Sequence, residues 1–286
     1  MTKGFPEMNL FRSFTAAAIL ALGFAAPASA VTNSPDFSDL WYLPEEPGWG
    51  INLSVQGTTM FAALYVYGAD NTPRWYVATN MAAQPAGSGQ FKFGGDLSST
   101  NGTYFGTVPY NPGQLAVTTV GTMAVTFTSA TAGTIVYNVG GVNVAKNIKR
   151  IRLADNSIVG SYIGGLATTQ NGCTNGANNG TPAYFIASGG VTTTQSGSAV
   201  TFQLQGVSGL QITCNFAGTY TQEGRLGKIT GGIWSCISPT AVVSSGTFEM
   251  TEVDVQTNGL TATFTGADNF CTSYVGRMGG LRAIGG

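Results

Sequence analysis

The sequence predicts an all-β fold in two antiparallel modules, the second of which is a small up-and-down barrel or a sandwich. Short runs rich in Val, Ile, Thr and aromatic residues repeat along the chain and are interrupted by Gly, Asn, Asp and Pro. Helical periodicity is nearly absent after residue 30. Hydrophobic residues make up 43% of the 286, which is enough to bury a core although only 9% are charged.

The first module begins as a meander of hairpins. Along residues 49–56, apolar side chains occupy every second position from Trp49 to Val55. Residues 60–67 return after a turn at 57–58, and residues 74–79 follow a turn at 70–73. Further strands are expected at 90–94, 102–108, 115–128, 133–139 and 142–152.

The second module offers eight short strand candidates after a break at 154–157. They lie at 158–168, 183–193, 198–206, 210–220, 227–236, 245–255, 259–265 and 272–283. Eight antiparallel strands with this spacing suit a closed barrel or a sandwich. Closure removes the free strand edges that promote aggregation, so a barrel is favoured.

The amino-terminal segment predicts export. The apolar run at 14–24 is too short to span a bilayer and is followed by Ala28, Ser29 and Ala30, an A-x-A cleavage signal. We therefore expect a signal peptide over 1–30, an aromatic-rich module over 31–154 and a disulfide-braced module over 155–286. The mature protein is expected in the periplasm or outside the cell, with no transmembrane segment.

The four cysteines all lie in the second half and predict disulfides. An even number in an exported chain is typical of disulfide bonding. The chain has no His and no C-x₂-C spacing, which argues against a metal site.

The pairing follows from hairpin symmetry and from barrel closure. Cys214 and Cys236 are equally far from Arg225, which lies in a predicted turn, so a hairpin places them opposite one another. Cys173 follows the first strand of the module and Cys271 precedes the last. These strands are neighbours in a closed barrel, and a bridge closing a loop of about a hundred residues contributes roughly 4–5 kcal/mol in the chain-entropy model.

The charge balance excludes broad classes of partner. Twelve basic and thirteen acidic residues provide no positive field for nucleic acid or acidic membranes. One basic cluster stands near the middle of the chain and consists of Lys146, Lys149, Arg150 and Arg152. A solvated strand edge is favoured over an anion site, because Lys on edge strands blocks the addition of further strands.

The composition also argues against an enzyme and against a cofactor. Without His, Ser-His-Asp and Cys-His sites and the commonest zinc sites are excluded. Paired carboxylates remain, but Glu45 and Glu46 stand between prolines and are expected to shape a turn. Glu252 and Asp254 share one face of a predicted strand and Glu249 the other. A solvated face is favoured there over a hydrolase site or a Ca²⁺ ligand pair.

Aromatic residues concentrated in the first module are the candidate binding residues. They are Trp41, Tyr42, Trp49, Tyr65, Tyr67, Trp75 and Tyr76. They can form the module's core, or their planar rings can stack on sugars and small cyclic ligands. Both roles are possible if one face of the strands points inward while Tyr65, Tyr67 and Tyr76 on the other face line a groove. Trp234, close to Cys236, is expected to pack on a disulfide.

A run of motifs spans residues 39–80. The order is a Trp, a Pro-Glu pair, Gly-Trp-Gly, a β-hairpin with an aromatic run, an Asp-Gly-like turn, Pro, and Trp-Tyr. The residues that carry it are Trp41, Pro44, Glu45, Gly48, Trp49, Gly50, residues 61–67, Asp70, Pro73, Trp75 and Tyr76. The glycine of the turn is replaced here by Asn71 or Thr72.

This segment resembles a module common in exported proteins of proteobacteria. The second half looks like a partner module seen with it, on the basis of Gly160, Ser161, Tyr162, Cys173, residues 218–222, Gly276 and Arg277. The resemblance covers most of the chain. It implies export and β architecture and implies no activity.

Three functions remain open. The first is a non-enzymatic exported binding or surface protein, with a glycan or a small apolar ligand held by the aromatics or by a barrel interior. The second is a structural module that contacts another exported protein and binds no small ligand. The third is a carboxylate-based hydrolase. A deep pocket with converging polar groups favours the first, a packed interior with an exposed flat aromatic patch the second, and facing carboxyls the third.

Overall fold

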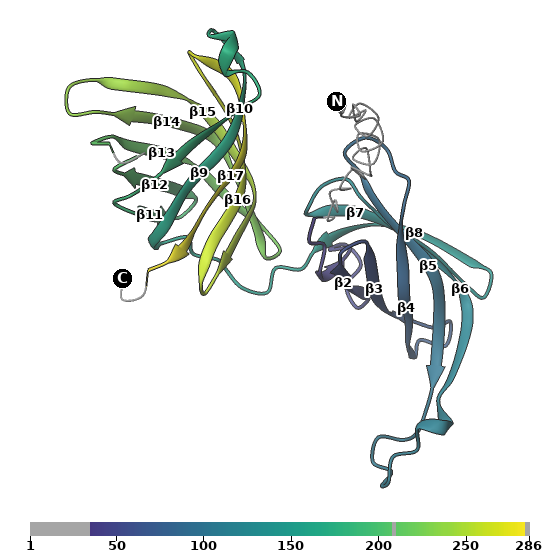
Figure 1. Ribbon diagram of the computed structural model, residues 1–286. Coiled ribbons are helices and arrows are strands. Elements are labelled where there is room, and N and C mark those ends of the chain that lie inside the picture. The colour runs from purple at the N-terminus through teal and green to yellow at the C-terminus, as the bar shows by residue number, and fades with distance from the viewer. Residues whose placement is uncertain (1–34, 208–209, 284–286) are drawn as a thin grey trace, which may run out of the picture. The chain divides into compact units, whose positions relative to one another are not determined.

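The computed structural model describes residues 35–207 and 210–283, and the predicted signal peptide with its cleavage site lies outside the described residues. The fold is all-β, as the sequence predicts, with two closed antiparallel barrels (Figure 1). None of the helices among these residues is long and apolar enough to cross a membrane.

The first barrel contains eight strands that follow one another in chain order until β8 pairs with β1. They are β1 (Asp39–Tyr42), β2 (Gly50–Gln56), β3 (Thr59–Tyr67), β4 (Pro73–Gln84), β5 (Phe91–Asn101), β6 (Ala116–Phe127), β7 (Ala132–Val139) and β8 (Val142–Arg150). The inward positions of these strands meet in one core around Trp41, Leu64, Met81 and Phe127.

The second barrel closes where β17 pairs with β9. Its strands are β9 (Gly160–Cys173), β10 (Thr181–Ile186), β11 (Val191–Ser196), β12 (Ala199–Gln205), β13 (Thr213–Glu223), β14 (Leu226–Ile237), β15 (Val242–Gln256), β16 (Gly259–Asp268) and β17 (Cys271–Arg282). Strands β10 and β11 lie end to end along β9 and share one place in the barrel, which therefore has eight positions. This broken strand was expected as one strand at 183–193.

The two barrels use separate sets of strands. Residues 151–159, which include the predicted break at 154–157, contain no strand. Among the described residues, strands β1–β8 pair with one another and strands β9–β17 pair with one another, with no pairing between the two sets. Separate folding of residues 31–154 and 155–286 stays a prediction.

One strand of the first barrel was missed, and one expected strand does not form. Strand β1 was not foreseen, because four residues are too few for a visible alternation. The strand expected at 102–108 does not form, since β5 stays paired with β6 only as far as Asn101 opposite Ala116. Residues 102–115 instead make a long connection that includes the short 3₁₀ helix η1 (Pro112–Gln114).

The turn between β3 and β4 explains the departure from the glycine of the motif. Asn71 has a φ of 59°, the left-handed conformation that glycine adopts most easily and that Asn tolerates. The Asp70 carboxylate accepts hydrogen bonds from the Thr72 backbone N–H at 3.1 Å and from the Thr72 hydroxyl at 2.8 Å. Asn71 therefore adopts the conformation expected of a glycine in this turn.

Candidate functional site

Three aromatic rings project from the outer face of the β3–β4 hairpin. Tyr65 lies directly opposite Trp75 in the ladder, and Tyr67 follows on the same face of β3. The alternate residues of β3, such as Leu64, are buried in the barrel core. Tyr67 and Trp75 are each 59% exposed and Tyr65 is 38% exposed. We call Tyr65, Tyr67 and Trp75 the aromatic face.

The Gly-Trp-Gly segment fits beneath this aromatic face. A methyl group on Gly50 would lie 2.5 Å from the Tyr65 hydroxyl oxygen, and one on Gly48 would lie 3.2 Å from the Tyr67 ring. Gly48 also has a φ of +106°, which disfavours any side chain. The two glycines therefore leave the space over which the tyrosine rings lie, while Trp49 packs against the barrel core.

Several aromatic residues expected in a binding surface face inward instead. Trp41 is completely buried, and its indole N–H donates to the Phe37 carbonyl at 3.0 Å. Tyr76 is opposite Leu64 and packs on the core, so it does not share the outward face of Tyr65 and Tyr67 as expected. The alternation of β4 turns Trp75 outward in its place. Tyr42 is half-buried at the end of β1.

A charged pair borders the Gly-Trp-Gly segment. The Lys146 ammonium forms an ion pair with the Glu46 carboxylate and lies 5.0 Å from the centre of the Trp49 ring. This cation–π contact and ion pair hold the turn at 44–48 against β8. The Lys146 hydrogen bond holds the pKa of the Glu46 carboxyl below its usual range. Glu46 is therefore a structural anion of the turn.

The basic cluster is not a strand edge. Strand β8 is paired on both sides, with β7 and with β1. The Arg150 side chain is buried and forms an ion pair with Asp39 at 2.8 Å, whereas Arg152 forms an exposed pair with Asp155 at 2.6 Å. The expectation of a solvated edge fails for Arg150, because barrel closure needed a strand, β1, that sequence patterning did not reveal.

The three carboxylates of β15 do not form a facing pair. A bulge between Thr251 and Asp254 breaks the period-two alternation on which their predicted faces depended. Glu252 accepts a hydrogen bond from Thr263 at 3.0 Å, and Asp254 forms an ion pair with Arg225 at 3.2 Å. Glu249 opens onto a shallow groove of about 580 Å³, and among the described lining residues it carries the only carboxylate.

The inward side chains of each barrel pack together in one core among the described residues. In the second barrel, the gap left between Leu166, Phe185, Phe216 and Trp234 is about 10 Å³, which is room for about one water molecule. In the first barrel, the inward residues Ile51, Met60 and Leu64 are completely buried. A small ligand therefore has no place in the gap of the second barrel.

The cysteines pair as the sequence predicts, Cys173 with Cys271 and Cys214 with Cys236. Each pair is directly opposed in its ladder. Trp234 is buried in the same core cluster as Cys214 and Cys236. The fold therefore has the first and last strands of the second barrel tied together and one central hairpin braced. Disulfides indicate an oxidising, exported environment.

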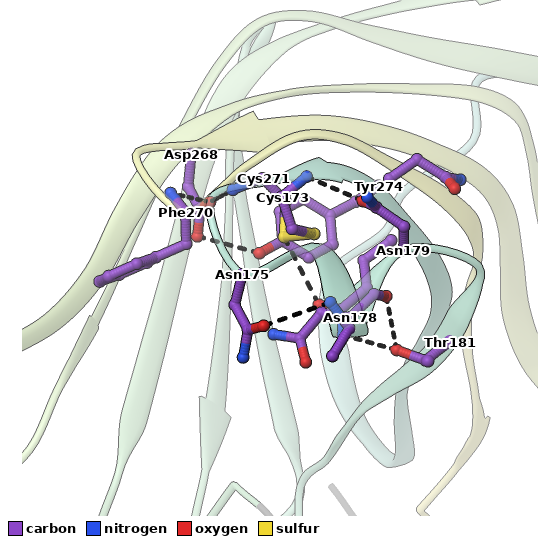
Figure 2. The surroundings of a disulfide bond; sticks show 12 residues. Cys173, Asn175, Asn178, Asn179, Thr181, Asp268, Phe270, Cys271 and Tyr274 are labelled. Atoms are coloured by element: carbon purple, nitrogen blue, oxygen red, sulfur yellow. Dashed lines mark hydrogen bonds between the residues drawn. A yellow bond between two sulfur atoms is a disulfide. The ribbon is translucent and has the colours of Figure 1, made fainter.

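The rim around the Cys173–Cys271 bridge is polar (Figure 2). The Asp268 carboxylate accepts hydrogen bonds from the Cys271 backbone N–H at 2.7 Å and from the Tyr274 hydroxyl at 3.1 Å. The Asn179 side chain accepts one from the Cys173 backbone N–H at 2.9 Å. Burial and the nearby Asp268 charge raise the pKa of Tyr274 to about 12. These contacts order the rim around the disulfide.

In the described part of the chain, no three His, Cys, Asp or Glu side chains gather into a group that could hold a metal ion. Sequence reasoning missed the exposed apolar connection at 102–115, because it assigned residues 102–108 to a strand. A signal was present, because the sequence has no charged residue from 97 to 145.

Comparison of the chain with protein-family models, with curated proteins and with solved structures finds no match.

Proposed function

We propose that this chain is an exported, non-enzymatic binding protein that holds a glycan on the aromatic face. The observation that carries the proposal is the exposure of Tyr65, Tyr67 and Trp75 together on one side of a rigid hairpin. Rings on a paired sheet lose little conformational freedom when they bind, since their backbone is already fixed.

The chemistry of the surface suits a sugar. The apolar faces of pyranose rings stack on flat aromatic side chains, and their hydroxyls need hydrogen-bonding neighbours. Asn52 and Ser54 are exposed on β2, where Asn52 pairs with Ala63 and Ser54 with Phe61 on the outward side of β3. Stacking rings with an amide and a hydroxyl nearby provide both kinds of contact.

Export is part of the proposal. The resemblance of residues 39–80 to exported proteobacterial modules and the A-x-A signal ending at Ala30 support a protein that is cleaved after residue 30 and is periplasmic or secreted. Family membership is likewise a proposal, and the seating of Tyr65 and Tyr67 over Gly50 and Gly48 supplies a physical reason for the motif.

The absence of catalysis is also proposed. The sequence has no His, and the β15 carboxylates Glu252 and Asp254 already have partners. No nucleic acid is expected as a partner because the net charge is −1. No cofactor is expected.

The test is a glycan array with the mature protein, followed by titration of a positive glycan. Trp75→Ala should weaken binding by about thirtyfold, which corresponds to about 2 kcal/mol for an aromatic hot spot. Tyr110→Ala is the matched control, because Tyr110 is also 59% exposed but belongs to the 102–115 connection. Failure of all glycans to bind, or equal weakening by both variants, would contradict the proposal.

The filled interiors favour a second candidate, in which the same aromatic face contacts another exported protein. Exposed flat aromatic patches are typical of protein contacts, where Trp and Tyr contribute much of the binding energy. In that case no glycan binds, and crosslinking from a photoreactive residue at position 75 captures a discrete partner in the periplasm or medium. Loss of capture in the Tyr67→Ala variant would assign the contact to the aromatic face.

A further inference from the structure

The β5–β6 hairpin carries an apolar tip well beyond the barrel (Figure 1). The strands remain paired out to Asn101 opposite Ala116, and residues 102–115 form the connection. Phe105 is 90% exposed and Val108 is 93% exposed. Other large exposed side chains of the connection are Tyr104, Tyr110 and Leu115. We call residues 102–115 the hairpin tip.

The hairpin tip is embedded in a charge-free stretch. No Asp, Glu, Lys or Arg occurs from residue 97 to 145, so the tip and both strands that carry it beyond Asp96 are uncharged. Charged side chains are the groups most strongly excluded from the hydrocarbon edge of a bilayer. The apolar tip therefore lacks the charged side chains that would oppose its entry into a bilayer.

Part of the backbone of the tip is paired within the tip itself. Thr107 donates to the Tyr104 carbonyl at 2.9 Å, and Leu115 donates to the Pro112 carbonyl at 3.2 Å. The Asn111 side chain accepts from the Gly113 N–H at 3.0 Å. Pro109 and Pro112 have no N–H to satisfy. Internal pairing matters because unpaired backbone groups cost several kcal/mol in lipid.

We propose that the hairpin tip docks peripherally on a lipid bilayer, with Phe105 and Val108 inserted at the boundary of the acyl chains. Tyr104 and Tyr110 would lie at the level of the headgroups, where amphipathic aromatic rings are enriched. The inference is independent of the glycan proposal, because it concerns a different surface of the same barrel.

A bilayer accounts for the observations better than a protein groove does. The most exposed side chains, Phe105 and Val108, stand on a protruding tip. A protruding tip is suited to insertion into a soft surface such as a bilayer. Tyr104 contacts Phe105, with ring centres 4.6 Å apart, so the two form one apolar wedge. The charge-free composition further implies binding that depends neither on anionic lipid nor on salt.

The experiment is co-flotation of the mature protein with phosphatidylcholine vesicles, with and without added phosphatidylglycerol, at low and high salt. We expect binding to both vesicles with little salt dependence. Val108→Asp should lower the bound fraction about tenfold or more, because a carboxylate resists insertion. Val142→Asp is the matched control, since Val142 is 65% exposed at the start of β8, outside the tip, and should change little.

Other variants separate this proposal from its rivals. Trp75→Ala should retain vesicle binding, and Val108→Asp should retain any glycan binding, so the two proposals can fail independently. Circular dichroism of each variant checks that the β fold is kept. Lack of wild-type binding, binding that requires phosphatidylglycerol, or an equal loss in Val142→Asp would overturn the inference. The inference would also be overturned if the wild type sediments as a dimer, Val108→Asp dissociates that dimer, and no vesicle binding is seen. That result would assign the tip to contact with a second copy of the chain.

Discussion

The two barrels are closed in different ways. In the first, β1 and β8 are paired where Trp41 faces Arg150 and Tyr42 faces Lys149. In the second, the ladder between β9 and β17 extends from Cys173 opposite Cys271 to the far end of both strands, with Tyr162 opposite Arg282. The first seam is therefore short and the second is long.

The short seam is reinforced by one buried side chain. The Arg150 guanidinium pairs with Asp39 at 2.8 Å, donates to the Ala130 carbonyl at 2.7 Å and lies 4.8 Å from the Trp41 ring centre. Burial is the largest influence on Arg150 and lowers its pKa, while the hydrogen bond and charge of Asp39 oppose that shift. An always-charged, five-donor side chain can satisfy several acceptors at once.

The long seam depends on backbone pairing and a covalent bond. Gly164 and Gly276 lie where a methyl group would meet a carbonyl oxygen at 2.0 Å on the neighbouring strand, so glycine permits the close approach. The Cys173–Cys271 bridge joins the strands at one end. A long ladder thus spreads its stabilisation over many residues, whereas the short seam concentrates it in a few side chains.

The largest expected effect comes from removing the seam disulfide. Cys173→Ser with Cys271→Ser opens a bridge with a sequence separation of 98, which in the chain-entropy model costs up to about 4.7 kcal/mol. Cys214→Ser with Cys236→Ser, at a separation of 22, should cost less, up to about 3.4 kcal/mol by the same model. Urea denaturation measures both losses.

The loss should be confined to the second barrel, since the first has no cysteine. Hydrogen exchange followed by mass spectrometry resolves peptides of each barrel and makes this visible. Faster exchange in β1–β8 after loss of the seam disulfide would show that the barrels are coupled and would contradict separate stabilities.

The next effect belongs to the first seam. Arg150→Met leaves the Asp39 carboxylate and the Ala130 carbonyl without their partner, and breaking such a buried pair typically costs about 3–5 kcal/mol. Arg152→Met removes an exposed pair with Asp155 and should cost less than about 1 kcal/mol. Chemical denaturation followed by tryptophan fluorescence compares the two variants. A similar loss of stability in both variants would mean that Arg150 does not specifically stabilise the seam.

Sequence patterning revealed most of the second barrel because most of its strands are long and are separated by recognisable turns. All eight strand positions and both disulfides could be predicted, since a symmetric hairpin and a closed sheet fix which cysteines face each other. The break between β10 and β11 was missed although Ser188, Gly189 and Gly190 mark a turn there, because the residues on both sides keep the composition of a strand.

Sequence patterning predicted less where tertiary contacts determine whether a strand forms and which way its side chains face. Strand β1 is only four residues long, so the buried role of Arg150 opposite it could not be anticipated. Alternation along β3 correctly separated Tyr65 and Tyr67 from the core, but the phase of β4 was misassigned by one residue, which exchanged Trp75 and Tyr76. A slip of one position reverses every side chain on a strand.

The smallest effect is a pH dependence at the rim of the second seam. Tyr274 is 7% exposed, and burial together with the neighbouring Asp268 charge raises its pKa to about 12. An unfolded tyrosine ionises near pH 10. The folded state therefore holds the phenolic proton more tightly than the unfolded state does. The resulting stabilisation is fully present below about pH 10 and is lost as the pH rises toward 12.

Tyr274→Phe tests this directly, because it removes both the ionisation and the hydrogen bond to Asp268 at 3.1 Å. At pH 8 the variant should be less stable by about 1 kcal/mol, the usual net contribution of one hydrogen bond. Between pH 10 and 12 the difference in stability from the wild type should shrink. The unfolded wild type releases its phenolic proton in this range, which lowers wild-type stability, whereas the Phe variant has no such proton. Tyr110→Phe, at an exposed tyrosine of the hairpin tip, is the control and should keep a constant, near-zero gap. Urea denaturation followed by circular dichroism at each pH measures both gaps. A Tyr274→Phe gap that stays constant through pH 12 would show that this phenol does not link the long seam to pH, and the contrast between the seams would then depend on the disulfide and the ladder alone.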